Sequence, residues 1–153
     1  MRTSLDRLVA EAAIRRRLLE YCRGIDRCDA DIVAGVYWPD GTDDHGSFQG
    51  LGTDFAVHAT DALARHALAT THLIGDSLLD WVDDATVDVE TPVMAVHRCA
   101  GGRDDAPGEY LERFAGRYFD RFTERDGDWR IAARRLTWDW DAREPVTRAP
   151  RGP

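Results

Sequence analysis

The hydrophobic pattern of this chain changes its period near residue 70. Before that point, apolar side chains recur every three or four residues, the spacing of one buried helical stripe, as at Ile14, Leu18, Tyr21 and Ile25. After it, apolar and polar residues alternate, which is typical of strands with one buried face. Helices followed by a run of strands predict an α+β fold, in which N-terminal helices wrap one face of a curved antiparallel sheet.

Capping and turn residues give approximate bounds to these elements. Ser4 is placed to cap the first helix, and Asp29 to cap a short second helix that ends at Pro39. A loop over residues 43–46 precedes a third predicted helix over 53–67. The four predicted strands span residues 71–81, 86–99, 112–125 and 129–140.

A sheet covered by helices on one side encloses a conical space, so we expect an α+β barrel with one internal pocket. The length of 153 residues suits a single domain, which is predicted here over residues 1–142. The remainder, 143–153, contains three prolines and few apolar residues. This composition predicts a flexible C-terminal tail.

Charge and composition narrow the classes of partner. With 20 basic and 28 acidic residues, the net charge is −8, the wrong sign for a protein that binds nucleic acid through its phosphates. No apolar run reaches the roughly 20 residues of a membrane helix, and the N-terminal residues lack the apolar core of a secretory signal. Three cysteines without CxxC spacing suit a reducing compartment. We therefore expect a cytoplasmic protein with a small-molecule partner, and no binding to nucleic acid or membrane.

Motifs for common cofactors do not occur in the sequence. There is no GxGxxG, Walker or GxSxG pattern, so nucleotide coenzymes and serine-hydrolase chemistry have no support. There is neither HExxH nor HxH spacing, and the acidic run with histidine at 43–45 is too local for a closed metal site. The sequence therefore predicts a protein without cofactor or metal.

Asp26 and His72 are the first candidates for chemistry. Histidine accepts and returns protons near neutral pH. A carboxylate on its other ring nitrogen fixes the tautomer and stabilises the imidazolium. We expect these two residues to form an acid–base pair between the end of the first helix and the start of the first strand. The alternative is a structural histidine that only satisfies a hydrogen bond.

Four further residues are candidates for the pocket wall. Tyr21 could donate a proton to a leaving hydroxyl or an enolising carbonyl, or could be a core residue of the helical stripe. His97 and His45 could each face the pocket, or could serve the strand or turn in which they lie. Arg134 could hold an anionic oxygen, or could straddle the sheet with its neighbour Arg135.

Tryptophans offer surfaces for a ligand or a second subunit. Trp38 and Trp81 suit an apolar ligand that is aromatic or polycyclic, although such residues also pack in cores. Trp138 and Trp140 lie in the last predicted strand. If they face outward on a sheet that the helices leave uncovered, they favour homo-oligomerisation.

The order and spacing of several short motifs resemble the SnoaL-like branch of the nuclear-transport-factor-2-like superfamily. The resemblance covers roughly residues 5–140, nearly the whole chain. The motifs are Tyr21 to Asp29, Asp43 to Gly46 with Gly50, Thr71 to Asp76, Gly116 to Tyr118, and Asp126 to Ile131 with Arg134.

Residues of this branch with known roles match positions in this chain. Asp26 and His72 match the catalytic pair of hexachlorocyclohexane dehydrochlorinase, and together with Tyr21 they match the triad of bile acid 7α-dehydratase. His72 and His97 are similar to the two histidines of scytalone dehydratase. The resemblance therefore implies a cofactor-independent, dehydratase-like lyase that forms dimers or trimers. Tyr21 replaces a lysine of the dehydrochlorinase, which argues against dehalogenation.

Two alternative functions remain open. An isomerase or a polyketide-type cyclase could use the same dyad and return the proton to a different atom. A non-catalytic module could bind a small ligand in the same cavity and release it unchanged. The fold alone does not separate these classes.

Overall fold

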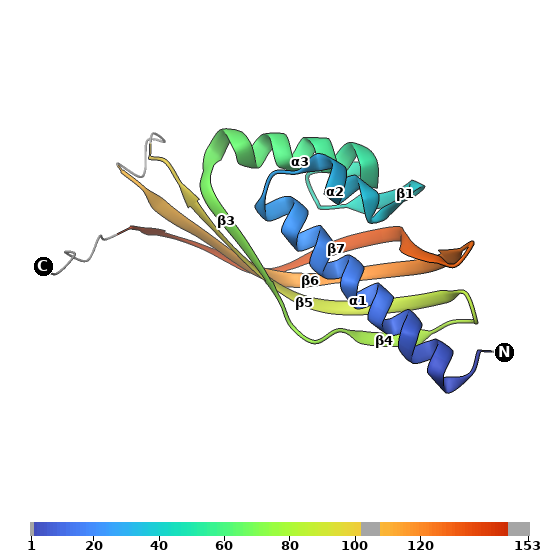
Figure 1. Ribbon diagram of the computed structural model, residues 1–153. Helices are drawn as coiled ribbons and strands as arrows, with labels where there is room; N and C mark the ends of the chain where they lie inside the picture. Colours follow the sequence, from blue (N-terminus) through green and yellow to red (C-terminus); the bar gives the residue numbers. More distant parts are fainter. Residues whose placement is uncertain (1, 102–107, 147–153) are drawn as a thin grey trace, which may run out of the picture.

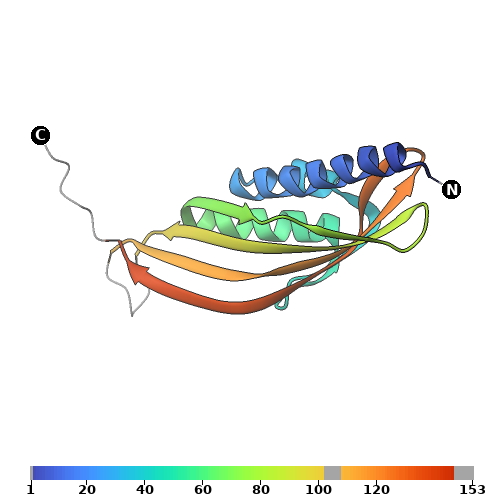
Figure 2. The ribbon, with the colours of Figure 1, turned by 90° about the horizontal axis from the view of Figure 1, so that it is seen from below.

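Three helices cover one side of a curved sheet in the computed structural model, which describes residues 2–101 and 108–146 (Figures 1 and 2). The helices are α1 (Ser4–Asp26), α2 (Ala30–Gly35) and α3 (Gly52–His66). None of them is long and apolar enough to cross a membrane. The predicted α+β class, with N-terminal helices wrapping a curved sheet, is confirmed.

Seven strands of the described chain form one open sheet. They are β1 (Tyr37–Asp44), β2 (Gln49–Leu51), β3 (Ala67–Ile74), β4 (Leu78–Trp81), β5 (Thr86–Cys99), β6 (Tyr110–Arg125) and β7 (Asp128–Pro145). Their order is β2-β1-β7-β6-β5-β3, with β4 also paired to β5. The pairs are antiparallel except for β1 and β7, which run parallel. The sheet is therefore mixed and open: β1 and β7 form one parallel pair, whereas the sequence suggested a curved antiparallel sheet in a conical α+β barrel.

Residues 37–44 form strand β1, where the sequence suggested the end of a helix and a loop. The backbone N–H of Ile131 donates to the Val36 carbonyl at 2.9 Å, and Tyr37 then pairs with Ile131 in the parallel register. The register shifts after Tyr37, which accommodates Pro39 because proline has no N–H for the ladder. Pairing with β7 therefore outweighs the local helical pattern.

The predicted strand over 71–81 is divided into β3 and β4. Both pair with β5, one on each side of Pro92. Between them the backbone N–H of Gly75 donates to the Pro92 carbonyl at 2.9 Å. Because Pro92 has no N–H to donate in return, the ladder is interrupted there.

The ends of two other elements differ from the predicted bounds. Thr3 rather than Ser4 caps α1: its hydroxyl accepts the Asp6 N–H at 3.2 Å, and the Asp6 carboxylate accepts the Thr3 N–H at 2.9 Å, which is a capping box. Strand β7 continues to Pro145, past the predicted start of the tail at residue 143. Residues 147–153 of that predicted tail lie outside the described residues.

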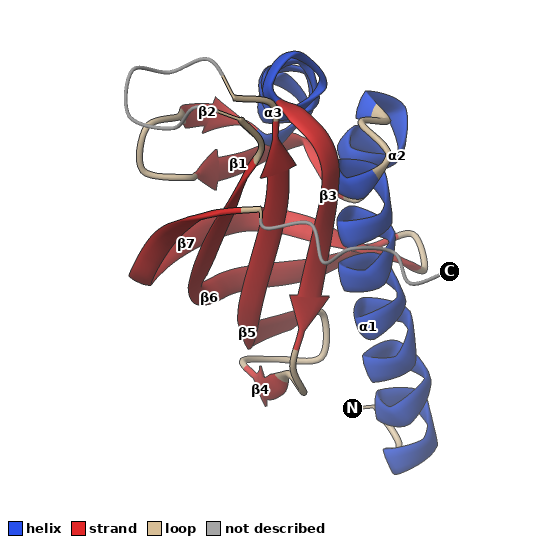
Figure 3. Ribbon diagram, turned by 90° about the vertical axis from the view of Figure 1, so that its left-hand side faces the viewer, coloured by secondary structure: helices blue, strands red, loops and turns tan. Residues whose placement is uncertain are grey.

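The apolar stripe of α1 lies at the centre of the core. Its four members are each at most 3% exposed: Ile14, Leu18, Tyr21 and Ile25. Strands β5, β6 and β7 contribute fully buried partners: Val87, Phe122 and Ile131. With α1 packed in this way, its last residue, Asp26, lies against β3, the strand beside α1 in Figure 3.

Candidate active site

A pocket of about 210 Å³ lies between the helices and the sheet. Its wall is mostly apolar and aromatic, and includes Phe48, Phe55 and Phe114. Four of the five histidines also line it: His45, His58, His72 and His97. An apolar cavity with a few convergent polar groups is the usual form of a small-molecule site.

Asp26 and His72, the first candidates from the sequence, are in contact. Asp26 Oδ1 lies 2.7 Å from His72 Nδ1, and Asp26 Oδ2 accepts the backbone N–H of His72 at 3.0 Å. The Thr70 hydroxyl donates to the same carboxylate at 3.4 Å. Because a carboxylate only accepts, a neutral His72 carries its proton on Nδ1 and keeps Nε2 as its basic nitrogen. His72 lines the pocket, so Nε2 is the atom available to a bound molecule.

His97, on strand β5, lies next to His72, which is on the neighbouring strand β3. The two ring centroids are 5.6 Å apart, and His97 is 7% exposed. Burial lowers the pKa of His97 to about 4, with a further contribution from the neighbouring His72. Within the described residues, His97 Nδ1 has no hydrogen-bond partner. His97 therefore presents a neutral ring at the pocket, and its buried Nδ1 is unpaired in the described part of the chain.

The low pKa of His97 predicts a loss of stability in acid. Between pH 6.5, the ordinary value, and about pH 4, the unfolded chain binds a proton at this position and the folded chain does not. Stability therefore falls as the pH drops through this window, and below it both states are protonated and the contribution is constant. His97→Gln should reduce this loss by about 1–3 kcal/mol, measured by urea unfolding at about pH 7 and about pH 4.5. An unchanged pH dependence in the variant would contradict the assignment.

A second carboxylate–histidine contact lies at the end of β1. His45 Nδ1 is 2.7 Å from Asp43 Oδ1, and Asp43 Oδ2 accepts the Tyr37 hydroxyl at 2.5 Å. The His45 ring stacks on Phe55, with centroids 4.2 Å apart. His45 was among the candidates from the sequence, but Asp43 and Tyr37 were not. Side chains two residues apart in a strand share a face, so a strand assignment for this segment would have pointed to Asp43.

Tyr21 lines the pocket and is 1% exposed. Burial raises the pKa of Tyr21 well above its ordinary value, and the nearby Tyr118 and Tyr37 add to the rise. Its ring meets that of Tyr118 edge to face, with centroids 5.6 Å apart. Tyr21 therefore keeps its proton near neutral pH, and it is a core residue of the α1 stripe.

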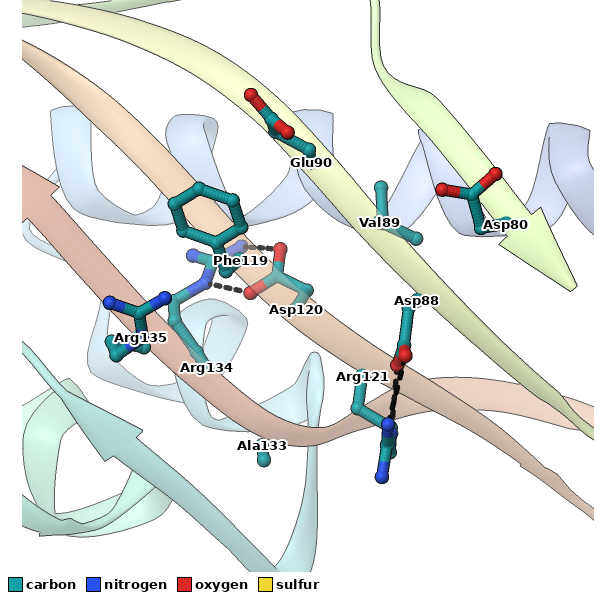
Figure 4. Close-up of a pocket in the computed structure, with 10 residues that line it drawn as sticks. All are labelled: Asp80, Asp88, Val89, Glu90, Phe119, Asp120, Arg121, Ala133, Arg134 and Arg135. Carbon is teal, nitrogen blue, oxygen red and sulfur yellow. Dashed lines mark hydrogen bonds and ion pairs between the residues drawn. The ribbon is translucent and has the colours of Figure 1, made fainter. Parts of the chain in front are cut away.

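Arg134 lies behind the pocket wall rather than in it. Its guanidinium is 4.1 Å from the ring centroid of Tyr21 and 4.0 Å from that of Tyr118. It donates to both carboxylate oxygens of Asp120, at 2.6 and 2.7 Å, from the position directly opposite on the neighbouring strand (Figure 4). Both side chains are fully buried. The anionic oxygens that Arg134 holds are therefore those of Asp120.

Trp38 and Trp81 are not among the residues that line this pocket. Trp38 donates its indole N–H to the Thr123 carbonyl at 3.1 Å. Trp81 packs edge to face on Trp129, with centroids 5.7 Å apart, and donates to the Glu11 carboxylate at 3.1 Å. The structure thus gives both tryptophans packing contacts, and other aromatic side chains line the pocket.

A larger hollow, of about 400 Å³, lies over the sheet at strands β4 to β7 (Figure 4). Its side chains are largely charged and include the exposed pair Asp88 and Arg121, whose atoms lie 2.7 Å apart. Four histidines and six phenylalanine, tyrosine and tryptophan side chains line the smaller pocket instead. We therefore place the candidate chemistry in the smaller pocket, despite its size.

No three His, Cys, Asp or Glu side chains within residues 2–101 and 108–146 are placed to hold a metal ion. The expectation from the sequence that the protein needs neither metal nor cofactor stays a prediction.

A protein-family profile matches most of this chain. It describes the SnoaL-like domain and matches residues 6–135, a range that contains both carboxylate–histidine contacts. The chain belongs to the SnoaL-like family. The resemblance seen in the short motifs is thereby confirmed. No curated protein matches this SnoaL-like sequence.

Solved structures share the fold of this SnoaL-like chain over nearly its whole length. A scytalone dehydratase-like protein from Novosphingobium aromaticivorans is 24% identical, with a TM-score of 0.76 over 94% of this chain and 97% of that one. A type 2 hexachlorocyclohexane dehydrochlorinase is 21% identical, with a TM-score of 0.84 over 98% and 99%. A protein of unknown function from Mycobacterium tuberculosis is 27% identical, with a TM-score of 0.72 over 90% and 76%. The first two likenesses establish the shared fold.

Proposed function

We propose that this SnoaL-like protein is a cofactor-independent lyase of the dehydratase type. Its substrate is small and largely apolar, and is aromatic or polycyclic. The observation that carries the proposal is the contact between Asp26 and His72 at the wall of an apolar pocket. Removal of a proton from carbon requires a basic atom held in position, and a pocket that excludes water strengthens its interactions.

The roles of the side chains follow from their contacts. His72 Nε2 takes the proton of a C–H bond next to a carbonyl, and Asp26 stabilises the imidazolium that forms. The electrons of the C–H bond form a C=C bond, the C–O bond to the neighbouring hydroxyl breaks, and its oxygen leaves as water after it gains a proton. In this proposal Tyr21, which lines the same pocket, donates a hydrogen bond to the carbonyl oxygen, where negative charge develops.

An activated elimination substrate tests this proposal before the natural substrate is known. 5-Nitrobenzisoxazole is a small aromatic compound that opens to a coloured phenolate once a base removes its C–H proton. We expect the parent protein to turn it over and His72→Ala to lose most of that activity. A parent rate no greater than that of His72→Ala would falsify the proposal and favour a module that only binds its ligand.

An isomerase or polyketide-type cyclase with the same dyad is the second candidate. The observation in its favour is the position of His97, which lines the same pocket with its ring centroid 5.6 Å from that of His72, so that two histidines can contact a bound substrate. Native mass spectrometry after incubation with an extract of the source cells can identify the ligand. A product lighter by one water supports the lyase, and a product of unchanged mass supports the isomerase.

We also propose that the protein is a cytoplasmic homo-oligomer, either a dimer or a trimer. The described helices all lie on one side of the sheet (Figure 2), and Trp140 of β7 is 47% exposed, whereas Trp138 lines the pocket. Exposed aromatic side chains on a sheet favour association. Light scattering at micromolar concentration should give the mass of two or three chains, and the mass of one chain would contradict this expectation.

A further inference from the structure

We propose that His45, held by Asp43, is the general acid of the pocket: it gives a proton to the departing oxygen while His72 removes the proton from carbon. This inference rests on the proposed function, because it supplies the other half of the same elimination. It starts from a contact that the proposed function does not use, the 2.7 Å approach of His45 Nδ1 to Asp43 Oδ1.

Asp43 is a buried carboxylate with a partner on each oxygen. It is 1% exposed, and a charge at such a depth is costly unless it is paired and hydrogen-bonded. Oδ2 accepts the Tyr37 hydroxyl at 2.5 Å, and Oδ1 faces His45. Burial raises the pKa of Tyr37 well above its ordinary value, so its phenol stays protonated and donates. The remaining oxygen is thereby directed at the His45 ring, which must donate from Nδ1.

His45 reaches the pocket from the side opposite His72. His72 lies on β3, and His45 directly follows β1. Strands β7, β6 and β5 lie between these two strands in the sheet, and both rings line the same pocket. Since the carboxylates engage Nδ1 in both cases, each ring keeps Nε2 for a molecule bound between them.

Other groups at the pocket are poorer proton donors. Burial lowers the pKa of His97 to about 4, so its ring is neutral near pH 7 and has no extra proton to give. Burial raises the pKa of Tyr21 well above its ordinary value, which makes the phenol a weak acid. Of the four lining histidines in the described chain, His45 and His72 are the two that contact a carboxylate, and a carboxylate stabilises an imidazolium.

The protons balance over one turnover. His72 Nε2 gains the proton of the C–H bond, and the departing oxygen keeps the electron pair of the broken C–O bond and takes the proton of His45 Nε2. Water leaves, His72 is then an imidazolium and His45 is neutral, and exchange with solvent restores both. The substrate class that fits is a β-hydroxy carbonyl compound, with its acidic C–H and its hydroxyl on neighbouring carbons.

The contact between His45 and Asp43 can be tested without any substrate. A proton shared between an imidazole Nδ1 and a buried carboxylate gives a strongly downfield proton NMR signal. We expect one such signal from His45 in the parent protein and in Asp26→Asn, and its loss in Asp43→Asn. Its absence from the parent spectrum, or its persistence in Asp43→Asn, would overturn the assignment of Asp43 as the positioning residue.

The acid role is tested with benzisoxazoles that carry progressively poorer phenol leaving groups. A general acid matters more as the leaving oxygen becomes more basic. We expect His45→Gln to lose little with the nitro compound and about 10- to 100-fold with the poorest leaving group, so that kcat depends more steeply on the leaving group than in the parent. Asp43→Asn should steepen this dependence in the same direction. His72→Ala should lower the rate with every member of the series.

The controls separate this inference from the proposed function. His66→Gln and Asp61→Asn make the same side-chain changes on the exposed side of α3, and should leave the leaving-group dependence as in the parent. If His45→Gln is folded and shows the parent's dependence, the general acid is wrong while the base at His72 stands. If His72→Ala is as active as the parent, the proposed function itself fails.

Discussion

His72→Ala is expected to lower kcat for 5-nitrobenzisoxazole by about 10²- to 10⁴-fold, the usual contribution of a positioned general base. A methyl group accepts no proton, and Asp26 then faces an empty space. KM should change little, because the apolar side chains of the pocket remain in place. The rate is followed by the colour of the phenolate, and His66→Gln is the matched control for loss of a histidine. A folded His72→Ala protein with the parent's kcat would contradict this role.

Asp26→Asn should come close to the same loss. The amide keeps the shape of the carboxylate, but it can present an N–H to His72 Nδ1 and select the tautomer with its proton on Nε2. That nitrogen would then be a donor and no longer a base. If Asp26 and His72 act as one unit, the double variant should be little slower than either single variant. Losses that multiply would show that the two side chains act independently.

Asp120→Asn is expected to lower the free energy of unfolding by about 3–5 kcal/mol, the cost of breaking a buried ion pair from one side. Burial raises the pKa of Asp120, and the charge of Arg134 and its bonds act against that rise. Without the carboxylate charge, Arg134 is a buried cation between Tyr21 and Tyr118. In the described structure its Nη1 already has no hydrogen-bond partner, so little is left to compensate for the loss.

The matched control is Asp88→Asn on the outer face (Figure 4). Asp88 forms a similar two-bonded contact with Arg121, at 2.7 and 2.8 Å, but both side chains are about half exposed. Exposed pairs contribute about 0–1 kcal/mol, so this variant should unfold at nearly the parent's urea concentration. Equal losses in the two variants would mean that burial does not set the strength of the Asp120–Arg134 pair.

Much of the candidate site could be predicted from residue type and position. The α1 stripe placed Asp26 at the end of a buried helix, and the motif resemblance paired it with His72. Asp43 was missed as a partner of His45 because residues 37–44 were expected to be helix and loop. The i and i+2 rule that would have linked Asp43 to His45 applies only once the segment is known to be extended.

The sequence by itself determined which face of each element is buried and where the helical half gives way to strands, because side-chain periodicity is a local property of the chain. Only the tertiary structure decided that β1 pairs in parallel with β7, that Pro92 separates β3 from β4, and that Asp120 forms an ion pair with Arg134. These contacts join residues far apart in the chain, and their energies depend on the burial that the whole fold creates. A buried charge needs a partner, and the fold rather than the local pattern determines which side chain that partner is.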